Sequence, residues 1–184
     1  MNATRRGIIT ALPIVGAGVL GLGFWRILSG MRTGTFDPRA INNPQVGKPV
    51  PNFAIPGLPG LGDGFTDAEL RAQTRPVLVN FFASWCIPCV QEMPGLRAIS
   101  RDLPIWGVAY EDKPENASAF VKRDGTPYAR VASDRHGRVA IDWGVTGVPE
   151  SFLVMPGGRI VWHGSAALDP ALFESEIRPH LARL

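Results

Sequence analysis

The stretch that decides the fold is Val77-Leu-Val-Asn-Phe-Phe-Ala-Ser-Trp-Cys-Ile-Pro-Cys-Val-Gln-Glu92. Its first seven residues are mostly apolar and β-forming, a pattern typical of a buried strand. The strand pattern stops at Ser84-Trp85, and the only two cysteines of the chain, Cys86 and Cys89, follow at the start of a helical pattern. Two thiols three positions apart in a first helical turn can close into a small disulfide or open to a dithiol.

A helix start favours a thiolate at the first of these cysteines. The backbone N–H groups of a first helical turn have no partner within the helix, and the helix dipole is positive there. Such a position lowers a cysteine pKa from roughly 8.5 to between about 3.5 and 7.5. The stretch therefore predicts a redox-active disulfide, Cys86–Cys89, that exchanges with a substrate disulfide.

Other uses of a cysteine pair fit this sequence less well. A structural bridge across two residues constrains almost none of the unfolded chain. A zinc site takes about four ligands, whereas the three histidines are scattered and there is no second cysteine pair. Haem attachment needs a histidine after the second cysteine, and Val90 stands there. We expect no metal and no cofactor.

The charge is uneven along the 184 residues. Residues 1–34 carry four arginines and no acidic residue, so the rest has 15 basic against 16 acidic residues. The globular part therefore lacks the net positive charge that is typical of nucleic-acid binding. The length fits one ordinary domain and an appendage.

The N-terminal segment predicts export. Arg5-Arg6 precede an uncharged, mostly apolar run at residues 7–25, long enough to cross a bilayer as a helix. Residues 1–29 then form an uncleaved signal-anchor in the inner membrane. A cleaved secretory signal and a twin-arginine signal are the alternatives. Each of them places the catalytic domain in the periplasm, where disulfides occur.

Residues 30–45 lack periodicity and predict a linker, followed by one domain at 46–184. The expected elements are an extended arm (47–55), a helix (66–75), a strand (77–83), a helix containing Pro94 (86–102), a strand (105–110), a helix capped by Asp112 (112–124), a strand (129–133), a short helix (139–143), a hairpin (147–155 and 159–163) and a closing helix (170–184). This order predicts an α/β fold with helices on both faces of a sheet.

Several motifs resemble the thioredoxin fold, a central mixed sheet with helices on both faces. They are Trp85-Cys86-Ile87-Pro88-Cys89, Pro94 and Val148-Pro149. Residues 46–182 more narrowly resemble the CcmG/DsbE group of membrane-anchored, thioredoxin-like reductants of cytochrome c maturation. The narrower signals are Gly47-Lys-Pro-Val-Pro, Glu92, Gly107-Val-Ala-Tyr-Glu-Asp112, Gly125-Thr-Pro-Tyr128 and Gly144-Val-Thr-Gly-Val-Pro-Glu-Ser-Phe-Leu153.

The chain departs from this group at two places. Glu111 stands where the group often has lysine, and Gly164-Ser-Ala-Ala-Leu168 replaces a more usual Gly-Asp-Leu after histidine. Asn80 replaces the aspartate of thioredoxin, but asparagine is what the group itself has there. The departures affect the partner surface more than the chemistry.

Five residues are candidates for the exchange and for substrate contact. We expect Cys86 to attack a substrate disulfide as a thiolate and Cys89 to resolve the mixed disulfide. The resemblance implies a cis bond before Pro149, which then lies against the disulfide. The backbone of Val148 is free to pair with an extended substrate, and Trp85 shields the cysteines and touches substrate.

Because Asn80 is neutral, the proton acceptor for Cys89 is open. Glu92 and Glu150 are the two candidates. The alternative for Glu92 is a carboxylate on the helix surface. Glu150 is a candidate because it follows the expected cis proline beside the disulfide.

The resemblance implies a reductant of apocytochrome c CxxCH cysteines, or of a dithiol partner in that pathway, recharged by a membrane electron donor of the DsbD/CcdA type. A general periplasmic reductant or oxidant of the TlpA/ResA or DsbA type is the alternative within the same class. A non-catalytic scaffold that binds apocytochrome or haem-lyase components is the alternative from another class.

Overall fold

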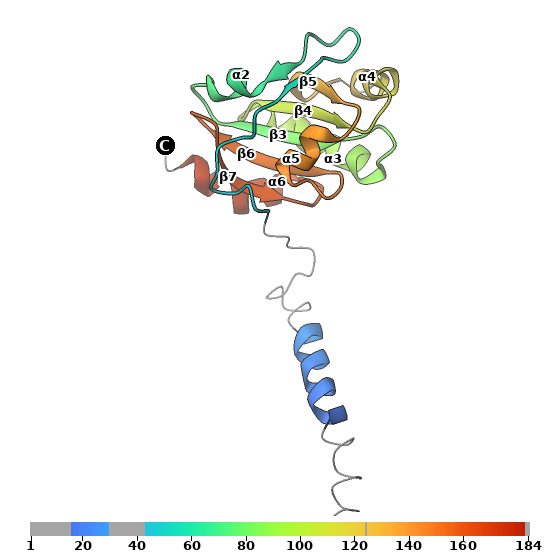
Figure 1. The fold of residues 1–184 in the computed structure, drawn as a ribbon, viewed down its shortest axis with the longest axis vertical. Helices are drawn as coiled ribbons and strands as arrows, with labels where there is room; N and C mark the ends of the chain where they lie inside the picture. Colours follow the sequence, from blue (N-terminus) through green and yellow to red (C-terminus); the bar gives the residue numbers. More distant parts are fainter. Residues whose placement is uncertain (1–15, 30–42, 124, 183–184) are drawn as a thin grey trace, which may run out of the picture. The chain divides into compact units, whose positions relative to one another are not determined.

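The structure is a computed structural model that describes residues 16–29, 43–123 and 125–182 (Figure 1). Residues 16–29 form a helix and belong to a unit separate from residues 42–184. The first part of the expected membrane segment (7–15) and most of the expected linker (30–42) lie outside the described residues. Within the described ranges, no helix is both long and apolar enough to cross a membrane.

A five-stranded mixed sheet forms the centre of the domain, in the order β5-β4-β3-β6-β7 (Figure 1). Strands β3, β4 and β5 are parallel, whereas β6 and β7 run antiparallel to their neighbours. Every residue of β3 is buried, as expected for a strand covered on both faces. The strands are β3 (Val77–Phe82), β4 (Ile105–Tyr110), β5 (Tyr128–Asp134), β6 (Glu150–Met155) and β7 (Arg159–Gly164).

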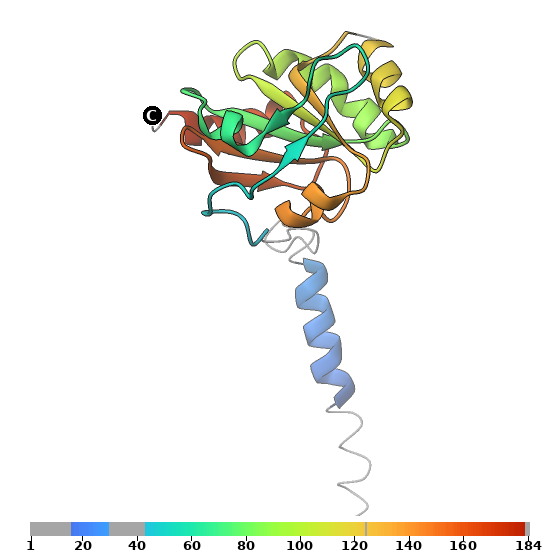
Figure 2. The same cartoon turned by 45° about the horizontal axis from the view of Figure 1, so that its top comes forward.

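Helices cover both faces of this sheet, so that a separate hydrophobic core lies on each face (Figure 2). One face carries α3 (Ile87–Ile99), α4 (Pro114–Arg123) and a C-terminal run of α6 (Pro170–Leu172), the π-helix η1 (Phe173–Ile177) and α7 (Arg178–Leu181). The other face carries β1 (Ala54–Ile55), β2 (Phe65–Thr66), α2 (Asp67–Arg71) and α5 (Arg138–Trp143). The α/β thioredoxin fold predicted from the sequence is confirmed.

Strand alternation decides which side chains reach which core. Leu78 and Phe82 of β3 pack in the core beneath α3, whereas Val79 and Phe81 pack in the core on the opposite face. Because successive side chains of a strand point to opposite faces, the same rule assigns Asn80 to the α3 face.

Local predictions differ from the structure mainly at element ends. The arm at 47–55 is a strand only at Ala54–Ile55, which pairs with β2, a strand that the sequence did not predict. The capping box of Thr66 and Glu69 is confirmed, but α2 ends at Arg71 instead of before Pro76. Strand β6 begins at Glu150, after the proline. The closing helix is interrupted by the π-helix η1.

Candidate active site

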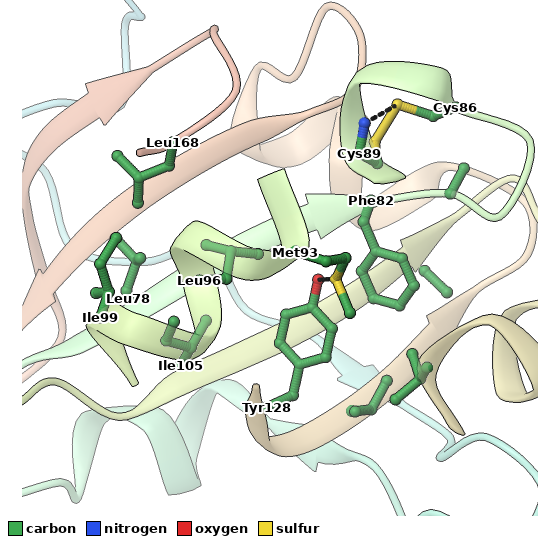
Figure 3. Close-up of a cluster of buried hydrophobic side chains, with 14 of the residues drawn as sticks. Leu78, Phe82, Cys86, Cys89, Met93, Leu96, Ile99, Ile105, Tyr128 and Leu168 are labelled. Atoms are coloured by element: carbon green, nitrogen blue, oxygen red, sulfur yellow. Dashed lines mark hydrogen bonds between the residues drawn. A yellow bond between two sulfur atoms is a disulfide. The ribbon is translucent and has the colours of Figure 1, made fainter. Parts of the chain in front are cut away.

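A disulfide joins Cys86 and Cys89 at the N-terminus of α3 (Figure 3). Cys86 is the N-cap residue, and its Sγ accepts a hydrogen bond from the backbone N–H of Cys89 at 3.1 Å. The same contact would serve a Cys86 thiolate after reduction, since an N–H donor stabilises negative charge on sulfur. The predicted position of the pair at a helix start is confirmed.

The cysteines themselves are buried, but their surroundings are not. Cys86 is 4% exposed and Cys89 0%, so the first cysteine is only slightly more accessible than the second. Next to them, Trp85 is 59% exposed and Ile87 72% exposed. A substrate that reaches Cys86 therefore meets large apolar side chains first.

The loop before the cysteines is held by the loop after β4. The Asp112 carboxylate accepts hydrogen bonds from the Ser84 backbone N–H at 2.6 Å and from the Ser84 hydroxyl at 3.0 Å. The Trp85 indole N–H donates to the Glu111 carbonyl at 3.4 Å. The expected role of Asp112 as a helix cap needs correction, because its carboxylate bonds the loop that precedes Cys86 instead.

The loop before β6 lies against the first cysteine. The Val148 carbonyl oxygen is 3.5 Å from Cys86 Sγ, and the Val148–Pro149 peptide bond is cis. Both features match what the family resemblance implied. Val148 is half-buried, so part of this residue faces solvent beside the disulfide.

Glu92 lies beneath the cysteine pair, one turn after Cys89 on α3. It is 3% exposed, which excludes the alternative of a surface carboxylate. Its Oε1 accepts a hydrogen bond from the Asn80 amide and its Oε2 from the Leu168 backbone N–H, each at 3.1 Å. Burial raises the pKa of Glu92 to about 7, and the two donors only partly offset that effect.

Tyr128 and Ser151, which the sequence did not identify as site residues, complete the polar cluster around Glu92 by bonding Asn80. The Tyr128 hydroxyl donates to Asn80 Oδ1 at 2.8 Å, and Asn80 Nδ2 also donates to the Ser151 hydroxyl at 3.1 Å. Burial, followed by the nearby Glu92 charge, raises the pKa of Tyr128 well above its usual value. Asn80 and Tyr128 are 48 positions apart, so no local pattern links them.

Glu150 occupies a different environment. Its Oε1 accepts from the Thr146 hydroxyl at 2.7 Å and from the backbone N–H groups of Thr146 and Gly147 at 2.8 and 3.1 Å. Its Oε2 lies 2.7 Å from His163 Nε2. Burial raises the pKa of Glu150, but the hydrogen bonds from His163 and Thr146 outweigh burial and hold this pKa below the usual range.

Register places Glu150 and Glu92 on opposite sides of the sheet. Ser151, the next residue of β6, pairs with Asn80 and bonds its side chain on the α3 face. Glu150 therefore points to the other face, where its neighbour His163 packs against Phe152 at a ring distance of 4.6 Å.

Comparison with known proteins agrees with this geometry. The AhpC/TSA family profile matches residues 46–163. The chain is 38% identical to the thiol:disulfide interchange protein HelX of Rhodobacter capsulatus over 93% of this chain and 94% of that protein. It is 35% identical to the thiol:disulfide interchange protein DsbE of Escherichia coli K12 over 78% and 77% of the two chains.

The chain belongs to the CcmG/DsbE family. Its relatives are thiol:disulfide interchange proteins, and with its own Cys-x-x-Cys disulfide it is a thiol:disulfide oxidoreductase. A solved structure from Chlorobium tepidum, described as a DsbE-type interchange protein, superposes with a TM-score of 0.62 at 27% identity. That match covers 74% of this chain and 96% of the other.

Proposed function

We propose that this oxidoreductase is a membrane-anchored, periplasmic reductant that acts during cytochrome c maturation. The observation that carries the chemistry is the Cys86–Cys89 disulfide at the start of α3, with the buried carboxylate of Glu92 one turn after buried Cys89. Residues 7–25 supply the anchor in this proposal, and residues 46–184 the catalytic domain.

The first step belongs to Cys86. In the reduced protein its thiolate, stabilised by the Cys89 N–H, attacks one sulfur of a substrate disulfide. A mixed disulfide forms with Cys86, the substrate S–S bond breaks, and one substrate sulfur leaves as a thiolate. In this proposal the backbone of Val148, a half-buried residue, pairs with an extended substrate strand, and Pro149 fixes that backbone beside the cysteines. The exposed Trp85 side chain contacts the substrate.

The second step belongs to Cys89. Its buried thiol must lose a proton before it can attack Cys86 Sγ, and we assign that proton to Glu92. The Cys89 thiolate then forms the Cys86–Cys89 disulfide and releases the second substrate thiolate. Two electrons have passed from the protein dithiol to the substrate, so a dithiol donor must reduce the protein again.

Glu150 fits the role of proton acceptor less well than Glu92. It lies on the face away from α3, and its carboxylate already accepts four hydrogen bonds, including one from His163. A carboxylate with a lowered pKa is also a weaker base. We therefore assign Glu150 to holding the loop that contains Val148 and Pro149.

The family resemblance suggests the partners. Apocytochrome c with a disulfide in its CxxCH motif, or a dithiol partner in the same pathway, is the proposed substrate. A membrane protein of the DsbD/CcdA type is the proposed electron donor. Both partners work at the periplasmic side of the inner membrane, where the predicted anchor would hold the domain.

The equilibrium redox potential of the full chain in detergent tests the direction of electron flow. A potential of about −200 mV or lower, towards the thioredoxin value of about −270 mV, supports a reductant. A value near the roughly −120 mV of DsbA would make the protein an oxidant and overturn this proposal. The Cys89→Ser variant should then trap a mixed disulfide with apocytochrome c through Cys86.

A scaffold without turnover is the rival from another class. A strain that carries the Cys86→Ser/Cys89→Ser protein separates the two, because a scaffold would still support cytochrome c assembly. We expect assembly to fail although the variant protein is present at the normal level.

A further inference from the structure

The Tyr128 hydroxyl is a buried polar group far from the cysteines in sequence, at the first position of β5. It donates to Asn80 Oδ1 at 2.8 Å. Met93 Sδ lies 3.9 Å from it (Figure 3). The ring stacks on Phe82 with centroids 5.0 Å apart. Packing against Phe82 accounts for the ring but not for the hydroxyl, whose hydrogen bond goes to Asn80.

An asparagine amide can be turned by half a rotation without changing its shape, and only its partners decide which end faces which group. A phenol hydroxyl can donate or accept; here it donates to Asn80 Oδ1, and this bond favours the orientation with the amide oxygen on that side. The amide nitrogen then faces Glu92 Oε1 and the Ser151 hydroxyl, both at 3.1 Å.

We propose that Tyr128 is a positioning residue of the exchange reaction: it holds the Asn80 amide so that its N–H group faces the Glu92 carboxylate. This inference rests on the proposed role of Glu92 as proton acceptor. Without the phenol donor, Asn80 can turn its oxygen toward Glu92, where that oxygen accepts a hydrogen bond from the neutral acid and repels the ionised carboxylate.

Two donors bond Glu92 directly, the Asn80 amide from β3 and the Leu168 N–H from the loop before α6. Tyr128 from β5 and the Ser151 hydroxyl from β6 bond Asn80 in turn. The Asp169 carboxylate in that loop caps the Leu172 N–H. Of these, the Asn80 amide is the group whose orientation Tyr128 controls.

The test uses Tyr128→Phe in the full-length protein, with Tyr110→Phe as the matched control. The chain has only these two tyrosines. The attack by Cys89 is measured as the rate at which a peptide is released from its mixed disulfide with Cys86, between pH 5 and 9. Thermal unfolding of each variant shows that it is folded before its rates are compared.

We expect Tyr128→Phe to move the midpoint of this pH profile upward by roughly 0.5 to 1 pH unit, the equivalent of about one hydrogen bond. The rate should fall about threefold at pH 6 and recover by pH 9, while Tyr110→Phe keeps the native midpoint. In a Glu92→Gln background, Tyr128→Phe should have no further effect on the profile.

A native midpoint in Tyr128→Phe, together with an altered profile in Glu92→Gln, would overturn the role of Tyr128 alone. An unchanged profile in Glu92→Gln would overturn the role of Glu92 and this inference with it. A fall in rate that is equal at all pH values would show that Tyr128 is merely structural, which also overturns it.

Discussion

Glu92 and Glu150 are two buried carboxylates on opposite faces of one sheet, and their environments push their pKa values apart. Glu92 is 3% exposed and Glu150 2% exposed. Glu92 receives one neutral donor on each oxygen, and burial raises its pKa to about 7. Glu150 receives three donors on one oxygen and a histidine on the other, which hold its pKa below the usual range.

Burial depth alone does not determine what a buried acid can do. A carboxylate with few donors keeps its affinity for a proton and can exchange it. A carboxylate with many donors stays ionised and fixes the groups that bind it. The first lies below the cysteines, and the second anchors the loop that touches Cys86.

The largest expected effect is on stability and separates the two carboxylates. Glu150→Gln places an amide N–H₂ against His163 and weakens three hydrogen bonds, so it should lower the free energy of unfolding at pH 7 by about 2 to 3 kcal/mol. Glu92→Gln also sets an N–H₂ group against one of two N–H donors, but it removes the cost of ionising a buried acid, so its net cost at pH 7 should be small. Urea denaturation of both variants checks this, and equal losses would erase the contrast.

The next effect is on the rate of mixed-disulfide resolution, and here the change at Glu92 should matter more than the change at Glu150. Glu92→Gln should slow resolution of the mixed disulfide at pH 7 by about tenfold to a hundredfold, because it removes the proton acceptor. Glu150→Gln, once shown to be folded, should stay within about threefold of the native rate. Stopped-flow measurement of single turnovers separates resolution from the attack by Cys86, and similar rates for both variants would contradict our assignment.

The free energy of unfolding should fall on both sides of a pH optimum, on the alkaline side because of Glu92 and on the acidic side because of Glu150. Glu92 has a raised folded pKa, so its favourable contribution is complete below about pH 4.5 and is lost as the pH rises to about 7, on the order of 3 kcal/mol. Glu150 has a lowered folded pKa, so its contribution is present above pH 4.5 and is lost as the pH falls. Glu92→Gln should therefore reduce the decline on the alkaline side, and Glu150→Gln the decline on the acidic side. Unfolding measured from pH 3 to 9 in oxidised protein checks both.

The smallest expected effect concerns the second donor to Glu92. A Cβ at Gly95 would lie 2.7 Å from the Leu168 carbonyl oxygen, so Gly95→Ala must push this loop away from α3. The Leu168 N–H then moves away from Glu92, and resolution at pH 6 should slow about twofold to threefold. The midpoint of the pH profile should rise. A lower midpoint would show that Leu168 does not support the ionised form.

Much of the fold was predictable because its signals are local. The apolar run of β3, the cysteines at a helix start and the glycine that ends α5 each occupy a few neighbouring residues. The bounds of the two-residue strand β1 and the existence of β2 were not predictable, since these strands are defined by their pairing and not by local propensity. Nor were the ends of the C-terminal helical run.

The site shows the same division. Cys86 caps the helix that carries Cys89 and Glu92. The cysteines could be assigned from this local pattern, and Glu92 was one of two candidate proton acceptors. Tyr128 reaches it only through the tertiary fold, and Leu168 contributes a backbone N–H that no residue type reveals. Glu150 looked equivalent to Glu92 because it follows the proline beside the disulfide, but strand register turns it to the other face.

The most direct test of the central contrast is a ¹³C NMR titration of both side-chain carboxyl groups in one sample of the oxidised protein. We predict a midpoint near 7 for Glu92 and a midpoint below 4.5 for Glu150. Two midpoints below 4.5 would contradict the account, because Glu92 would then be fully ionised at neutral pH and could not be the acid–base group that we assign to Cys89.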